Sequence, residues 1–135
     1  MKKIYTLLFV SLITLVFNDL QAQQKPDKLP VYPGCEQSQD KMACMKDEIL
    51  SFIGEEFNAD LLKQIKDTKQ MSMSIVFVID ESGNIENIRI NSGYDSINKE
   101  MLRVIKKLPK IKPAESGGQP IPMRYELPLF FDTGK

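Results

Sequence analysis

Residues 72–90 read SMSIVFVIDESGNIENIRI, and this stretch decides the fold. Its first half alternates apolar residues with other residues, as a half-buried strand does; the apolar set is Met73, Ile75, Phe77 and Ile79. Residues 80–84 then supply turn-forming residues before a second strand over 85–90, so the pattern predicts an antiparallel β-hairpin. Val76 and Val78 are apolar too, which leaves two arrangements open: the first strand is covered on both faces, or its outer face meets an N-terminal helix.

Segments on both sides of the hairpin have the spacing of amphipathic helices. In residues 40–57 the apolar stripe comprises Met42, Met45, Ile49, Phe52, Ile53 and Phe57. Gly54 interrupts this pattern, and residues 58–65 predict a second, short helical piece after a break. After the hairpin the apolar face comprises Ile97, Met101, Leu102, Val104, Ile105 and Leu108, opposite a basic face. We expect this helix to pack on the hairpin.

A last strand is predicted near the C-terminus. Its alternating apolar residues are Ile121, Met123, Tyr125, Leu127 and Leu129. Pro122 and Pro128 fall within it, and proline cannot donate to a strand ladder, so the strand belongs at a sheet edge. The elements together predict an α+β fold: a small antiparallel sheet built as strand, strand, helix, strand, with a helical extension before it.

The N-terminus predicts export. Lys2 and Lys3 precede an apolar run over 4–17, and Ala22 offers a cleavage position, so residues 1–22 are interpreted as a signal peptide removed near Ala22. The alternative is an inner-membrane anchor facing the periplasm, although a membrane span needs roughly 20 apolar residues. Residues 23–33 then form a short proline-containing tether that we expect to lie outside the core.

The chain has two cysteines, Cys35 and Cys44, and an exported protein meets an oxidising compartment. We expect a structural disulfide, which on the entropy model restricts the unfolded chain by about 2.7 kcal/mol. The competing interpretations are a redox site and a zinc site. The first usually shows C-x-x-C, and the second needs further ligands in a chain that has no histidine. The disulfide lies in a helical extension over 34–70, ahead of a domain over 71–131.

Charge and side-chain chemistry narrow the function. The formal net charge is +0, so no overall field favours nucleic acid. The carboxylate pairs Asp80-Glu81 and Glu55-Glu56 flank a turn and a helix end, whereas acid–base catalysis needs groups that converge in a pocket. We therefore expect no enzyme, no cofactor and no metal site.

Three stretches resemble the TonB C-terminal domain. They are the Pro33-Gly34-Cys35 motif with Cys44, the strand and turn VFVIDESGNI over 76–85, and the segment from Leu108 through Pro113 and Gly118 to Phe130. The cysteine-bearing extension is similar to the form common in TonB-like proteins of Bacteroidetes-type bacteria. The resemblance implies a TonB C-terminal-like fold over 71–131.

The resemblance also implies a function. Domains of this family lie in the periplasm and bind the TonB box, a short segment of outer-membrane TonB-dependent transporters, by strand addition beside the last strand. Carried over to this chain, the partner-binding edge comprises Ile121, Met123, Arg124, Tyr125, Glu126 and Leu127. The alternative is a soluble accessory or self-associating module, such as a homodimer, with no role in energy transduction. It is favoured by the short tether, since the family's transducers carry a membrane helix and a long proline-rich spacer.

Overall fold

The computed structural model describes residues 25–67 and 69–133. The predicted signal peptide lies outside the described residues. The elements, in chain order, are helix α2 (Lys41–Glu56), the 3-10 helix η1 (Ala59–Gln64), β1 (Gln70–Ile79), β2 (Ile85–Asn91), α3 (Asp95–Ile105), β3 (Ala114–Ser116), β4 (Gln119–Ile121) and β5 (Met123–Asp132). The predicted α+β fold and its strand, strand, helix, strand order are confirmed.

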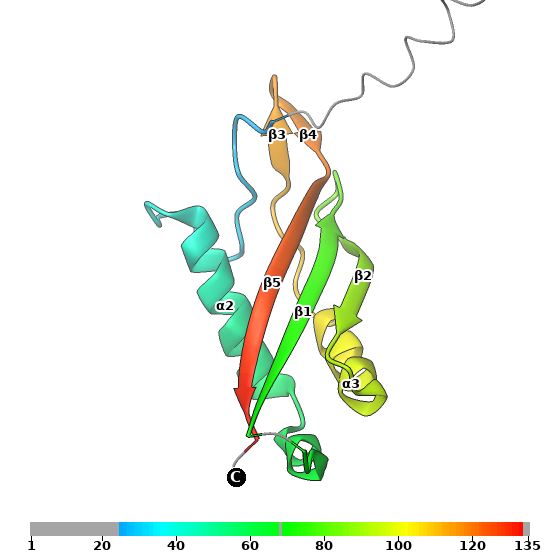
Figure 1. Cartoon of the computed structure of the whole chain (residues 1–135). Helices are drawn as coiled ribbons and strands as arrows, with labels where there is room; N and C mark the ends of the chain where they lie inside the picture. Colours follow the sequence, from blue (N-terminus) through cyan, green and yellow to red (C-terminus); the bar gives the residue numbers. More distant parts are fainter. Residues whose placement is uncertain (1–24, 68, 134–135) are drawn as a thin grey trace, which may run out of the picture.

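The main sheet is antiparallel and has the order β2-β1-β5, with β1 in the middle (Figure 1). The ten residues of β1 all pair with β5, from Gln70 opposite Asp132 to Ile79 opposite Met123. The buried residues of β1 are Met71, Met73, Ile75, Phe77 and Ile79, one on every second position. The sheet therefore buries one face, as the alternation in the sequence predicts.

Both helices pack on that buried face. Met45, Ile49 and Ile53 of α2 belong to the same apolar cluster as Ile75 and Phe77. The buried residues of α3 that join this cluster are Ile97, Met101, Val104 and Ile105. The outer face of the first strand does not meet the N-terminal helix, and Val76 and Val78 stay only half-buried there. Of the two arrangements left open by the sequence, neither holds, because the buried residues of α2 and of α3 both join the cluster on the buried face, to which Val76 and Val78 do not belong.

The two predicted helical pieces of the extension are confirmed with a break between them. The carboxylate of Asp40 accepts the N–H of Ala43 at 2.9 Å and so caps α2 at its start. Gly54 lies inside α2 and does not end it, since the helix continues to Glu56. Asn58 caps η1 by accepting the N–H of Asp60.

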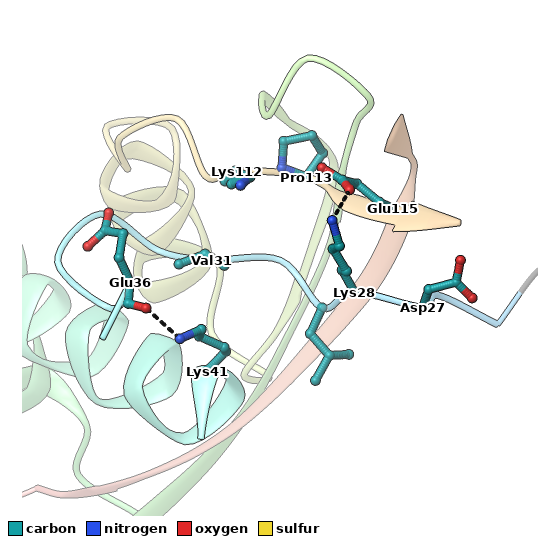
Figure 2. A pocket seen from close by; sticks show the side chains of 9 residues that line it. Asp27, Lys28, Val31, Glu36, Lys41, Lys112, Pro113 and Glu115 are labelled. Carbon is teal, nitrogen blue, oxygen red and sulfur yellow. Dashed lines mark hydrogen bonds and ion pairs between the residues drawn. The ribbon is translucent and has the colours of Figure 1, made fainter. Parts of the chain in front are cut away.

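The described part of the segment predicted to be a tether, residues 25–33, lies against the domain instead. Lys28 and Val31 form bridges with Glu115 and Lys112, and Tyr32 is buried. Figure 2 shows this segment running alongside Pro113 and Glu115. The prediction that it stays outside the core was wrong, because backbone pairing with residues some 85 positions later gives the prolines an ordered place. The predicted disulfide between Cys35 and Cys44 is present, with Cα atoms 5.9 Å apart, and links the end of this segment to α2.

The predicted last strand is divided at Pro122. Ile121 ends β4, where it pairs with Ala114 of β3, whereas Met123 begins β5 and pairs with Ile79 of β1. Proline has no N–H and fixes its own φ, so Pro122 separates the β3–β4 ladder from the β1–β5 ladder. The apolar residues alternate without a break through this position, which is why the sequence predicted a single strand. The small β3–β4 hairpin was not predicted from the sequence, because a strand of three residues carries almost no periodicity.

The hairpin turn between β1 and β2 holds the crossover to β3 in place. Gly83 has a φ of +83°, and its carbonyl accepts the N–H of Ile111 at 3.0 Å. A Cβ at this position would collide with the carbonyl oxygen of Ile111. Gly83 is therefore required both by its left-handed conformation and by the close approach of another backbone.

We expect Gly83→Ala to lower the free energy of unfolding by clearly more than Gly93→Ala. Gly93 has a similar φ of +80° but nothing within 4 Å of an added Cβ, so its substitution carries only the backbone strain, about 1–2 kcal/mol. Urea unfolding followed by circular dichroism measures both. Equal losses would show that the contact between Gly83 and Ile111 contributes nothing.

Candidate functional site

The candidate site is the outer edge of β5. Among the described residues, β1 is the strand that pairs with β5, and no second strand lies on its other side (Figure 1). An edge of this kind presents unpaired N–H and C=O groups that can pair with another chain. β5 is also long, with ten residues, so it offers several consecutive pairing positions.

The register determines which backbone groups point outward. The N–H of Thr133 donates to the carbonyl of Lys69 at 2.9 Å, one step beyond the pairing of Gln70 with Asp132. Residue pairs of an antiparallel ladder alternate between hydrogen-bonded and non-bonded, so the odd-numbered residues of β5 bond to β1. The even-numbered residues Arg124, Glu126 and Phe130 then direct both N–H and C=O outward, and Pro128 directs only its carbonyl.

The opposite edge of the sheet is less suited to pairing. The register between β1 and β2 shifts between Val76 and Val78, and Asn87 of β2 has a φ of 52°. This is a β-bulge, which bends a strand and interrupts the regular row of backbone groups that a further strand would need. β5 is therefore the regular edge of the sheet.

The predicted site residues occupy three different environments. Ile121 lies in β4, away from the main sheet, and Met123 is half-buried at the start of β5. Tyr125 and Leu127 point into the core, where the ring of Tyr125 lies 5.4 Å from that of Phe77. Arg124 and Glu126 are exposed and form an ion pair at 3.1 Å. Arg124 and Glu126 thus combine an outward backbone with an exposed side chain.

Phe130 is not among the site residues predicted from the sequence. Its side chain is 81% exposed, and its backbone points outward as in Arg124 and Glu126. It continues the even-numbered series of β5, so the alternation itself was the signal that could have revealed it. An exposed large apolar side chain beside unpaired backbone groups favours contact with another chain.

The helical extension is joined to α3 by a charged cluster near the far end of β5. Arg103 donates to Glu100 at 2.6 Å and to the backbone carbonyl of Glu56 at 2.8 Å, and Lys107 reaches the Glu56 carboxylate at 2.6 Å. The N–H of Asn58 donates to Glu100 at 3.1 Å. These contacts hold the end of α2 and the start of η1 against α3 and the residues that follow it.

The hydrogen bonds from Arg103 lower the pKa of Glu100 to about 2, against an ordinary value of 4.5. A hydrogen bond from Lys107 likewise lowers the pKa of Glu56. Both carboxylates are therefore charged at neutral pH and keep their partners.

A pocket lies away from the outer edge of β5, and charged side chains that line it already pair with other groups of the protein. It has a volume of about 450 Å³ and is lined by the N-terminal segment and by residues 112–115 (Figure 2). Lys28 pairs with Glu115 at 3.1 Å, and the ammonium of Lys41 donates to the backbone carbonyls of Glu36 and Ser38. Within the described ranges, no group of acidic, cysteine or histidine side chains is arranged to hold a metal ion.

A protein-family comparison matches residues 65–133 to the C-terminal domain of the Gram-negative bacterial TonB protein. The chain belongs to the TonB C-terminal family. A comparison with curated proteins found no match. The TonB C-terminal match covers the whole sheet and α3 but begins after α2 and the disulfide, so the resemblance of the extension to one bacterial group stays a prediction.

The TonB C-terminal family consists of non-enzymatic periplasmic domains associated with energy transduction in transport. Its members interact in general with outer-membrane transporters. In the part of the chain that is described, no helix is long and apolar enough to cross a membrane.

We expect Glu100→Gln to destabilise the protein at neutral pH, and the difference from wild type to disappear in acid. The carboxylate has a lowered pKa when folded, so its contribution is present above about pH 4.5 and is lost as the pH falls toward 2. Urea unfolding of both proteins between pH 7 and pH 2 measures this. Glu81→Gln, in the hairpin turn, is the control for losing one carboxylate. A difference that stays constant with pH would contradict the assignment.

Proposed function

We propose that this protein is a periplasmic binding module that accepts an extended segment of an outer-membrane transporter, the TonB box, as an additional strand beside β5. The outer edge of β5 carries the proposal. Its unpaired backbone groups at Arg124, Glu126 and Phe130 are arranged at every second position, as a pairing strand requires.

Several features support this edge over others. β5 is held in register by β1 over its full length, so the outward groups are fixed before a partner arrives, and less entropy is lost on binding. The exposed side chains of Arg124 and Glu126 carry opposite charges, which leaves the edge without a net charge that would repel a peptide. Main-chain pairing gives affinity, and the exposed side chains adjust it.

A proline placed on the outer edge tests the proposal. Glu126→Pro removes an N–H that points away from β1, so the internal ladder keeps its hydrogen bonds and the fold is expected to survive. A peptide carrying a TonB box from the host's own transporters should bind this variant about tenfold more weakly, because one backbone hydrogen bond is lost and the ring obstructs its neighbour. Isothermal titration calorimetry measures the affinity.

Glu126→Ala is the matched control. It removes the same side chain and the ion pair with Arg124 but keeps the N–H, so it should bind almost as well as wild type. In a ¹⁵N–¹H spectrum the peptide should shift the amide signals of Arg124, Glu126 and Phe130 most. Equal binding by the proline and alanine variants, or unchanged signals along β5, would refute strand addition.

The exposed phenyl ring of Phe130 favours a second candidate function, self-association through the same edge. Two copies of β5 would pair antiparallel and bury both Phe130 rings. If this is the function, light scattering at millimolar concentration shows a dimer that Glu126→Pro and Phe130→Ser both dissociate. A wild-type monomer under those conditions rejects the homodimer and leaves the transporter segment as the partner.

A further inference from the structure

An apolar pocket lies at the far end of β5, and we call it the end pocket. It has a volume of about 230 Å³ and is formed by the last turns of α2, by η1 and by residues 129–131 of β5. Its lining includes Leu50, Gly54, Phe57, Leu62 and Phe131, and among the described residues no charged one takes part. Most of this lining comes from the extension, which lies outside the TonB C-terminal match.

The end pocket reaches the outer edge of β5. Three consecutive residues of the strand, Leu129, Phe130 and Phe131, line it. Consecutive side chains of a strand point to opposite faces, and the other walls of the pocket come from η1 and from α2, which Figure 1 shows on the side of β5 away from β1. The inner edge is occupied by β1, where Met73 pairs with Leu129 and Met71 with Phe131. The pocket therefore opens at the edge where a further strand would pair.

Gly54 keeps the end pocket open. It lies in the last part of α2, where glycine costs about 1 kcal/mol of helix stability relative to alanine. Its φ is in the ordinary helical range, and a Cβ added there would meet nothing within 4 Å. Neither backbone conformation nor close packing requires glycine here. What the glycine does provide is space between α2 and β5.

Two sets of contacts join the walls of the end pocket to the rest of the domain. The rings of Phe57 and Phe131 stack with their centroids 5.8 Å apart, which joins the end of α2 to β5. The cluster of Arg103, Glu100 and Glu56 holds the same end of α2 against α3. A preformed apolar cavity of this kind loses little free energy in reorganisation when it is filled.

The register of β5 predicts which residue of a paired segment would enter the end pocket. The residue of that segment that hydrogen-bonds to Phe130 places its side chain on the open face of the sheet, beside the phenyl ring. Its neighbours lie opposite Leu129 and Phe131, and their side chains point toward the helical layer. One of these neighbours therefore faces the end pocket directly.

We propose that the end pocket accepts one large aliphatic or aromatic side chain of the segment that pairs with β5, and that it thereby selects among partners. This inference rests on the proposed function, since strand pairing is what brings the side chain to the pocket. The edge supplies affinity for any extended segment, and the pocket adds a requirement for an apolar residue at one position.

The test combines peptide and protein substitutions. In the TonB-box peptide, each apolar residue is replaced in turn by Thr, which preserves strand propensity but removes apolar volume. At one position the replacement should weaken binding to wild type by about tenfold to a hundredfold, the range for burying one large apolar side chain. Gly54→Leu fills the pocket, so this variant should bind the unchanged peptide more weakly than wild type does, by a similar factor. The peptide with Thr at the sensitive position should bind the variant and wild type with the same affinity.

Gly54→Ala is the matched control, because it strengthens the helix but adds only a methyl group, so most of the pocket remains. Both variants carry good helix formers and should unfold at or above the wild-type temperature, which circular dichroism checks. The inference would be overturned if Gly54→Leu bound the parent peptide as tightly as wild type does. It would also be overturned if no Thr replacement in the peptide weakened binding. Strand addition beside β5 would stand in either case. No shift along β5 with any peptide would overturn both.

Discussion

The pairing of β1 with β5 is the interaction on which the rest of the structure depends. It joins residues that lie between 44 positions apart (Ile79 and Met123) and 62 positions apart (Gln70 and Asp132), and it runs without interruption for ten pairs. Because β1 is central, this pairing determines which face of the sheet receives the helices and which backbone groups of β5 are left for a partner. A shift of one residue would send Tyr125 and Leu127 to solvent and Arg124 and Glu126 into the core.

The extension changes what the edge can recognise. The family domain provides the sheet and α3, and the extension adds α2 and η1 on the buried face, where they flank the end of β5. Two constraints hold the extension: the Cys35–Cys44 disulfide near the start of α2 and the Arg103 cluster at its end. The disulfide restricts the unfolded chain and is lost on reduction, whereas the Arg103 cluster acts through charge and is weakened in acid.

Much of the fold was predictable from sequence because the elements carry strong periodic signals. The alternation from Met73 to Ile79 and the helical stripe from Ile97 to Leu108 are each set by a face that must be buried, so they can be seen without the partner element. The disulfide was predictable from compartment and cysteine number. The weak points were Pro122 and the segment around Val31, where a single residue or a distant partner strand decides the outcome.

The sequence by itself determined the helices, the β1–β2 hairpin, the buried faces of β1, α2 and α3, the disulfide, and the placement of the last strand at an edge through its prolines. Only the tertiary structure decided which residues of that edge point outward, because this depends on the register between chain segments far apart in sequence. The same holds for Phe130 and the end pocket, whose walls come from α2, η1 and β5. Local patterns specify the face to which a side chain belongs, but a cavity exists only once separate elements are packed.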